Sequence, residues 1–164
     1  MIVSLNDKVA LVTGASRGIG RAIAVALGKC GATVVGTATS NEGAEKITAG
    51  LKAEGVSGRG YALNVCDKEV IKETYKQITD EWGAPLILVN NAAITQDNLF
   101  LRMKTEQWES VIKTNLDGVF HLTKAAMRAM LKARWGRIVN ITSIVAIMGN
   151  PGQVNYSSSK AALT

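Results

Sequence analysis

Histidine, cysteine and proline are scarce in this sequence of 164 residues, which contains one histidine, two cysteines and two prolines. The single histidine, His121, excludes a histidine-rich metal site, and a serine–histidine triad would have to use it. Its neighbours Phe120 and Leu122 indicate an ordinary helix residue. Cys30 and Cys66 have no metal-site spacing and no disulfide framework, so we expect both to be buried or half-buried side chains of a cytoplasmic protein.

Long apolar runs are also missing. No run approaches the roughly 18 apolar residues of a membrane helix, and the first seven residues lack the basic region and apolar stretch of a signal peptide. We therefore expect no membrane association. The formal net charge of +6 favours anionic ligands and partners. We do not expect nucleic acid binding, because the basic residues are scattered among acidic ones and no helix-turn-helix or RNA-binding signature is present.

Short apolar segments and helix-like segments alternate along the chain. Hydrophobic residues make up 47% of the sequence, which is enough for the core of one domain over residues 1–164. Apolar runs predict strands at residues 8–12, 32–37, 60–65, 86–90 and 137–143. Helices are predicted at residues 21–27, 42–54, 68–82 and 105–134, with another beginning near residue 154. This alternation predicts a doubly wound, Rossmann-type α/β fold, whose parallel sheet binds ligands at the carboxyl ends of its strands.

A glycine-rich turn, Thr13–Gly20, joins the first predicted strand to the first helix. Its spacing is Gly-x-x-x-Gly-x-Gly rather than the commoner Gly-x-Gly-x-x-Gly. Glycines let the backbone turn sharply and approach a pyrophosphate, and the free N–H groups and dipole of the following helix favour an anion. The alternative is a tight connection without a ligand. Because the turn follows the first strand of a strand–helix alternation, we interpret it as a dinucleotide site.

The segment that ends the second predicted strand, Gly36–Asn41, has no acidic residue to hold a ribose 2′-hydroxyl, as NAD-selective sites do. Arg17 lies inside the glycine turn. A cation and hydroxyl groups without a carboxylate suit the 2′-phosphate of NADP. The alternative makes Arg17 a solvated loop residue and Thr39–Ser40 a helix cap. We favour NADP(H) as the cofactor.

Amide side chains follow two further predicted strands. Asn64 and Val65 end the third strand, where an adenine fits against Val65 and bonds to Asn64. Asn90–Ala93 ends the fourth strand, and its small residues let a cofactor approach while its amides pin backbone and ribose. Loop capping is the alternative for these asparagines.

Four polar residues form a candidate catalytic group. Tyr156 and Lys160 are four apart on a predicted helix and share one face. A free phenol has a pKa of about 10, and a nearby ammonium and a cationic nicotinamide favour the phenolate, so the pair suits general acid/base chemistry. Ser143, at the end of the fifth strand, is placed to donate to a substrate oxygen, and Asn115, within the long helix, to hold a proton-relay water. Each has an ordinary alternative: an exposed helix pair for the tyrosine and lysine, a cap for the serine and a solvent-facing amide for the asparagine. Their combination at one edge of the sheet favours a catalytic role.

These motifs resemble the short-chain dehydrogenase/reductase family in order and spacing. The residues that carry the resemblance are Thr13-Gly14-x-x-x-Gly18-x-Gly20, Asn90-Asn91-Ala92, Asn115, Ser143 and Tyr156-x-x-x-Lys160. Segments 13–22, 36–40, 97–104 and 148–150 are similar to bacterial 3-oxoacyl-[acyl-carrier-protein] reductases. The resemblance covers the whole chain and implies NADPH-dependent reduction of 3-oxoacyl-[acyl-carrier-protein] to the 3-hydroxyacyl form in fatty-acid synthesis.

The resemblance also assigns roles. Tyr156 protonates the ketone oxygen as hydride arrives from the nicotinamide, Lys160 favours the phenolate and holds the ribose, Ser143 fixes the carbonyl, and Asn115 supports the proton relay. The implied cofactor contacts are Gly14, Ser16, Arg17, Ile19, Thr39, Asn64, Val65, Asn91, Tyr156 and Lys160. No metal site is implied.

Two kinds of partner are expected from the same resemblance. One is a second copy of the chain, since these enzymes are usually tetramers packed through their fourth and fifth helices. The other is an acidic acyl carrier protein, for which Arg134 is the docking candidate within the basic cluster Arg128, Lys132, Arg134 and Arg137. The alternative for this cluster, which we weigh more heavily, is favourable placement of cations at a helix C-terminus.

Two departures from the family pattern matter. Family members usually have glycine at the position of Ala93, so we expect a slight displacement of the backbone beside the nicotinamide. They also continue beyond the position of Thr164, so the resemblance implies a chain incomplete at its C-terminus. We expect these 164 residues alone to be poorly soluble or partly disordered near that end, and inactive. The alternatives are an oxidoreductase acting on another ketone or alcohol, such as acetoacetyl-CoA, and an inactive fragment that binds nucleotide.

Overall fold

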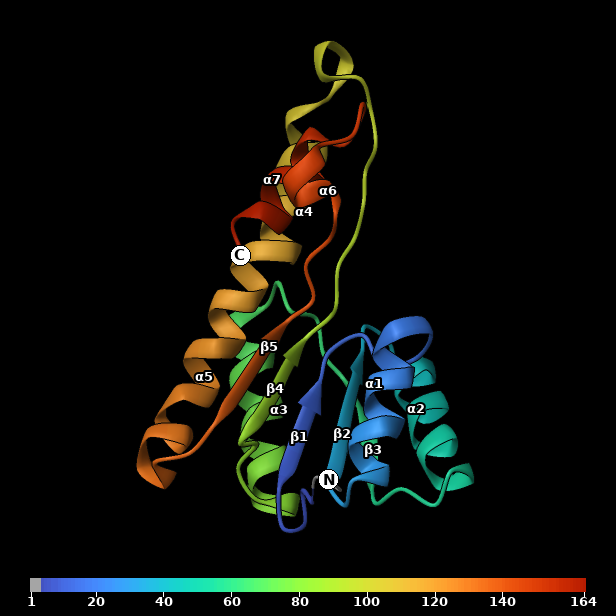
Figure 1. Cartoon of the computed structure of the whole chain (residues 1–164), viewed down its shortest axis with the longest axis vertical. Helices are drawn as coiled ribbons and strands as arrows, with labels where there is room; N and C mark the ends of the chain where they lie inside the picture. Colours follow the sequence, from blue (N-terminus) through green and yellow to red (C-terminus); the bar gives the residue numbers. More distant parts are fainter. Residues whose placement is uncertain (1–3) are drawn as a thin grey trace.

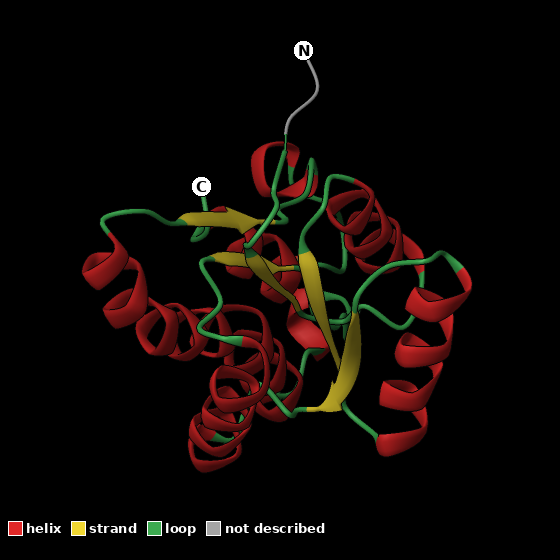
Figure 2. Ribbon diagram, turned by 90° about the horizontal axis from the view of Figure 1, so that it is seen from below, coloured by secondary structure: helices red, strands yellow, loops and turns green. Residues whose placement is uncertain are grey.

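A five-stranded parallel sheet with helices on both faces forms the body of the molecule (Figures 1 and 2). The computed structural model describes residues 4–164. The strands lie in the order β3-β2-β1-β4-β5. Their bounds are β1 Val9–Val12, β2 Thr33–Ala38, β3 Gly58–Ala62, β4 Ile87–Asn90 and β5 Arg137–Asn140. The predicted doubly wound parallel sheet is therefore confirmed, and the strand order reverses between β1 and β4, which is where such folds bind ligands.

Seven α-helices connect and extend this sheet within residues 4–164. Their bounds are α1 Gly18–Lys29, α2 Asn41–Ala53, α3 Lys68–Trp82, α4 Thr105–Ile112, α5 Gly118–Ala133, α6 Val145–Met148 and α7 Val154–Ala161. A short 3₁₀ turn, η1, covers Phe100–Arg102, and a π-helical turn, η2, covers Lys113–Asp117. None of these helices combines the length and the apolar character needed to cross a membrane.

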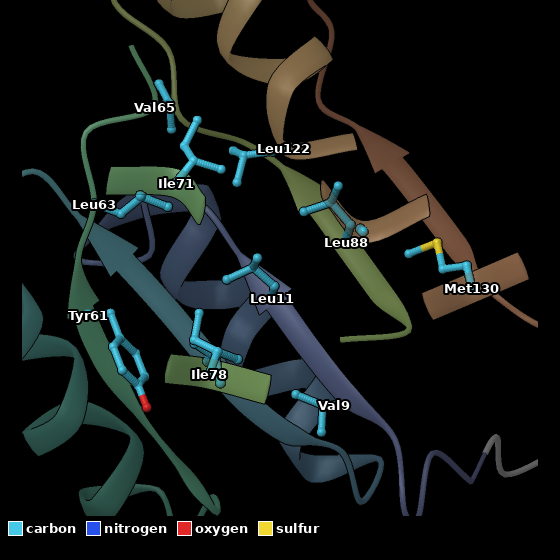
Figure 3. Packing of buried hydrophobic residues seen from close by; sticks show 12 residues of the cluster. Val9, Leu11, Tyr61, Leu63, Val65, Ile71, Ile78, Leu88, Leu122 and Met130 are labelled. Carbon is cyan, nitrogen blue, oxygen red and sulfur yellow. The ribbon is translucent and has the colours of Figure 1, made fainter. Parts of the chain in front are cut away.

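The two faces of the sheet are packed by alternate residues of the same strands. Val9 and Leu11 of β1 belong to a cluster with side chains of α3 and α5, such as Ile78 (Figure 3). Ala10 and Val12 belong to the opposite cluster, with side chains of α1 and α2. Successive side chains of a strand point to opposite faces, so apolar residues at every position of β1 require a sheet that is covered on both sides.

Side-chain and glycine signals define the ends of several helices as expected. Asp67 accepts hydrogen bonds from the N–H groups of Glu69 and Val70, at 3.0 and 3.1 Å, and so caps α3. Gly83 follows the same helix with φ +88°, a backbone conformation that glycine adopts without strain. Ser40 accepts from the N–H of Gly43 and caps α2, so the cap interpretation of this serine is confirmed.

Two predicted strand ends and the predicted course of two helical regions were wrong. The third strand ends at Ala62 rather than at residue 65, and the fifth at Asn140 rather than at Ser143. The single helix predicted over 105–134 is interrupted by η2, and α6 was not predicted. Apolar residues continue past β3 and β5, but the chain turns there. In η2 the wider turn accommodates the hydrogen bonds of Asn115 to a segment outside the helix.

The region beyond the carboxyl ends of the strands is built by α4, α6 and α7 (Figure 1). The chain leaves β4, passes through η1 and returns as α4. The first helix residues of α7 fix it to this segment, since the buried amide of Asn155 donates to the carbonyl oxygens of Gln96 and Gln107 at 2.9 and 3.2 Å. This packing holds α7 above the sheet edge at which β4 ends.

Candidate active site

The glycine-rich turn after β1 adopts a conformation that requires its glycines. Gly14 and Gly18 have φ values of +65° and +55°. A side chain at Gly20 would collide with the carbonyl oxygen of Gly14 and lie 2.5 Å from Nδ2 of Asn91. Helix α1 therefore begins directly against the turn, and its first N–H groups lie at the carboxyl end of β1.

Thr13 and Asn91 lock this turn to the end of β4. The hydroxyl oxygen of Thr13 accepts hydrogen bonds from the N–H groups of Asn91 and Ala92, at 3.0 and 2.9 Å. The amide of Asn91 donates to the carbonyl oxygens of Thr13 and Gly14, at 2.8 and 3.2 Å. The neighbouring Asn90 instead donates to Asn140 of β5 at 2.9 Å. The expectation that these amides pin the backbone is confirmed for Asn91, whereas the amide of Asn90 binds side chains.

A cleft of about 680 Å³ opens at the carboxyl ends of β1, β2, β3 and β4. All eight positions named as cofactor contacts outside α7 line it together: Gly14, Ser16, Arg17, Ile19, Thr39, Asn64, Val65 and Asn91. Among the described residues that line the cleft, Arg17 is the one cation and none is a carboxylate. The glycine turn, the helix N-terminus and this charge balance fit a phosphorylated dinucleotide.

The part of the cleft at which we expect an adenine is formed by a loop rather than by a strand. Asn64 and Val65 follow β3, and the side-chain oxygen of Asn64 accepts from the N–H of Cys66 at 3.0 Å, which turns the chain toward α3. This hydrogen bond is the local capping that we gave as the alternative for the asparagine, yet both residues line the cleft. Ala93, where the family usually has glycine, also lines the cleft. Its φ is not positive, so this position does not require the left-handed conformation that glycine favours.

Asn115 is completely buried in η2, so the alternative that it is a solvent-facing helix amide is wrong. Its side-chain oxygen accepts from the N–H of Ile94 at 2.9 Å, and its Nδ2 donates to the carbonyl oxygen of Ile94 at 3.0 Å. The second Nδ2 hydrogen bond goes to Ser159 of α7, at 3.1 Å. Asn115 therefore joins the cleft-lining segment after β4 to the helix that carries Tyr156.

Lys160 is nearly as buried, with 2% of its surface exposed. Its ammonium donates to the carbonyl oxygen of Ile141 at 2.7 Å and lies 5.9 Å from the ring centroid of Tyr156. Burial lowers the pKa of the Lys160 ammonium below its usual value, because desolvation disfavours the charged form. Tyr156 and Ser143 are both half-buried, and Ser143 lies in the segment between β5 and α6.

Several residues that build the site carried no distinctive sequence signal. In the sequence, Ser159 is only one of three serines between Tyr156 and Lys160, and Thr13 is only the first residue of the glycine turn. Thr114 lines the cleft beside Asn115. Serine and threonine occur in every class of structure, so only the fold reveals which groups these hydroxyls contact.

A family model described as short chain dehydrogenase matches residues 8–164. The chain belongs to the short-chain dehydrogenase family. Within it, this short-chain dehydrogenase is 57% identical to the 3-oxoacyl-[acyl-carrier-protein] reductase FabG of Pseudomonas aeruginosa. It is 55% and 54% identical to the proteins of the same name from Vibrio harveyi and Escherichia coli. Each match covers 98% of this chain and 65% of the relative, so the chain spans just under two thirds of these proteins.

Proposed function

We propose that this short-chain dehydrogenase reduces 3-oxoacyl-[acyl-carrier-protein] to the 3-hydroxyacyl form with NADPH, in fatty-acid synthesis. The observation that carries this proposal is the buried bridge made by Asn115. It binds Ile94, which lines the cleft, and Ser159, which precedes Lys160, and so joins the cleft to the helix that carries Tyr156 and Lys160. The identities of 54–57% with relatives named as these reductases support the choice of substrate.

NADPH supplies a hydride when it is bound. In our proposal the guanidinium of Arg17 holds the 2′-phosphate, and the hydroxyl of Thr39 lies at the same end of the cleft. The N–H groups at the start of α1 face the pyrophosphate, which Gly14 allows to approach closely. Asn64 and Val65 take the adenine. Further contacts from Ser16, Ile19, Asn91, Tyr156 and Lys160 complete the proposed set.

The chain's own residues provide the proton and the orientation. The phenol of Tyr156 donates its proton to the ketone oxygen, and Ser143 holds that oxygen with a hydrogen bond. Lys160, a buried cation 5.9 Å from the Tyr156 ring, favours the phenolate that remains and holds the ribose. Both Nδ2 donors of Asn115 and one side of its oxygen are already engaged, so we assign it the task of holding Ile94 and α7 in place for the relay.

We also propose that the protein assembles with further copies of itself, as a tetramer, and takes its substrate from acyl carrier protein. Exposed apolar side chains on α5 support the assembly, since Phe120 and Leu131 are 58% and 69% exposed. Arg134 lies between the end of α5 and the start of β5, whereas the cleft lies at the carboxyl ends of the strands. A carrier docked there is remote from Tyr156 of the same chain, which favours the helix-end interpretation of this cation.

One assay separates the proposal from its alternatives. Oxidation of NADPH is followed with an acyl-carrier-protein thioester, with acetoacetyl-CoA and with simple ketones, and NADPH binding is titrated in parallel. Preference for the carrier-bound thioester is expected. Equal or better turnover of an unrelated ketone would point to another short-chain oxidoreductase, and binding without turnover of any substrate would point to an inactive nucleotide-binding chain.

A further inference from the structure

The turn that carries Asn115 is in direct contact with the loop at the adenine end of the cleft. The hydroxyl of Thr114 lies 3.3 Å from the sulfur of Cys66, within hydrogen-bond distance. One turn later, a side chain at Gly118 would lie 2.9 Å from Cγ2 of Val65, so the helix backbone packs closely against that residue. Two successive turns of the helix therefore rest on the same loop.

That loop is a single connected unit. The N–H of Cys66 is held by the side chain of Asn64 at 3.0 Å, and Val65 between them is buried. Asn64, Val65 and Thr114 all line the cleft, so a group seated against the loop also lies beside Thr114. Moving Asn64 or Val65 would move Cys66, and Cys66 contacts Thr114.

From Thr114 the contacts continue to the catalytic helix. The next residue, Asn115, binds Ile94 and donates to the buried hydroxyl of Ser159, which in turn donates to the carbonyl oxygen of Tyr156 at 2.8 Å. Two hydrogen-bonded contacts thus connect Asn64 through Cys66 to Thr114, the backbone connects Thr114 to Asn115, and the hydrogen bond of Asn115 to Ser159 reaches α7. The contact between Cys66 and Thr114 is the weak one, because a thiol is a poor hydrogen-bond partner.

We propose that Thr114 is a positioning residue that couples occupancy of the adenine end of the cleft to the placement of Asn115. The inference rests on the proposed function, since it takes an adenine nucleotide as the occupant of the Asn64–Cys66 loop. It assigns Thr114 no contact with the reacting atoms. Its hydroxyl transmits the position of the loop to η2, and Asn115 transmits it to α7.

The test uses adenosine 2′,5′-bisphosphate, which has the adenine and 2′-phosphate of NADP but no nicotinamide. Backbone hydrogen exchange is measured at residues 115–118 in the free and the bound chain. We expect binding to slow exchange there by at least about fivefold, a typical size for coupling between sites. In Thr114→Val, which keeps the shape but loses the hydroxyl, the slowing is expected to disappear while the nucleotide still binds within about threefold of its original affinity.

Two variants keep the test decisive if Thr114→Val folds poorly. Cys66→Ala removes the same contact from the other side and is expected to abolish the slowing, whereas Cys66→Ser supplies a stronger partner and is expected to preserve it. Thr123→Val is the matched control on α5, because Thr123 is paired with Asn90 rather than with the loop, and it should leave the slowing intact.

The outcomes separate the two proposals. Binding of adenosine 2′,5′-bisphosphate without slower exchange at 115–118 would overturn the coupling and leave the cofactor site standing. Equal slowing in the original chain, Thr114→Val and Cys66→Ala would also overturn it. No binding of the nucleotide or of NADP⁺ to the original chain would overturn the proposed cofactor site, and the coupling with it.

Discussion

The amide of Asn115 and the hydroxyl of Ser159 form a hydrogen bond of 3.1 Å between two completely buried residues. One lies in the π-helical turn between α4 and α5, and the other lies on α7, 44 residues later. A buried donor left without a partner costs about 1–3 kcal/mol, so this bond fixes the relative position of the two helices. The same bond therefore also fixes where Tyr156 and Lys160 lie, because they are on either side of Ser159 in α7.

The proton-donor role of Tyr156 predicts that Tyr156→Phe keeps the fold and NADPH affinity but loses activity. The aromatic ring remains, and only the hydroxyl is removed. Loss of general acid catalysis lowers rates by about 10²–10⁴-fold. Steady-state oxidation of NADPH with acetoacetyl-CoA measures the effect in a version extended to the length of the relatives, because we expect the 164 residues alone to be inactive. Ser158→Ala, an exposed change on the same helix, is the control and should be nearly neutral. Normal turnover by the phenylalanine variant would remove Tyr156 from the mechanism.

Arg17 is the one cation among the described residues that line the cleft, which predicts a cofactor-specific effect of Arg17→Ala. Loss of a charge-assisted hydrogen bond to the 2′-phosphate costs about 1.5–3 kcal/mol, so NADPH should bind about 10- to 100-fold more weakly. NADH lacks this phosphate and should bind almost unchanged. Titration of both cofactors by fluorescence checks this. Arg21→Ala, in the first turns of the helix that follows Arg17 and outside the cleft, serves as control. Equal losses for NADPH and NADH would contradict the assignment.

Gly20 and Gly50 predict opposite effects of the same substitution. Both lie in helices without positive φ. A methyl group at Gly20 would meet the Gly14 carbonyl and Asn91, whereas at Gly50 its nearest neighbour is Nε of Arg21 at 3.9 Å. Gly20→Ala should lower the free energy of unfolding by about 1–3 kcal/mol through overpacking. Gly50→Ala should raise it by about 0.5–1 kcal/mol through helix propensity. Urea denaturation of both variants measures the sign, and a stabilised Gly20→Ala would show that the turn tolerates a side chain.

Tyr75 on α3 predicts a loss of stability at alkaline pH. Its buried hydroxyl has no hydrogen-bond partner among residues 4–164, and burial raises its pKa from 10.0 to about 12. As the pH rises, the unfolded chain releases this proton before the folded chain does. The protonated phenol therefore contributes fully to the free energy of unfolding below pH 10, and this contribution is lost as the pH rises toward 12. Tyr75→Phe should be more stable by about 1–3 kcal/mol at pH 7, because the unsatisfied hydroxyl is gone.

The comparison of Tyr75→Phe with the original chain isolates this residue, because all other titrating groups are shared. Urea denaturation at pH 7 and pH 10.5 gives the two differences in unfolding free energy. The advantage of phenylalanine should be larger at pH 10.5. An advantage that shrinks with pH would show that the Tyr75 phenol is not held protonated by the fold.

The sequence predicted the sheet and the lining of the cleft because those features depend on local patterns. The continuous apolar run of β1, the capping carboxylate of Asp67 and the spacing of the glycine turn are all read within a few residues. The hydrogen bonds that assemble the site instead join residues that are far apart in the sequence. Asn115 and Ser159, or Thr114 and Cys66, are polar residues far apart in the chain, and no periodicity links them. The end of β5 was misplaced for a related reason: Ile141 continues the apolar pattern, but its carbonyl oxygen binds Lys160 rather than extending the ladder.

Arg134 provides the last prediction, because two interpretations of it differ in outcome. It follows α5 in the left-handed conformation with φ +50°, where glycine is favoured and other residues are strained by roughly 1–2 kcal/mol. Arg134→Gly should therefore raise the free energy of unfolding under either interpretation of this residue. If acyl carrier protein docks here, Arg134→Glu should raise KM for a carrier-bound thioester about tenfold and leave KM for acetoacetyl-CoA unchanged. Lys52→Glu, an exposed charge reversal in the last turn of α2 and outside the basic cluster, is the matched control. An equal effect of Arg134→Glu on both substrates would assign Arg134 to the helix end alone. Its place before β5, away from the carboxyl ends of the strands that form the cleft, favours that outcome.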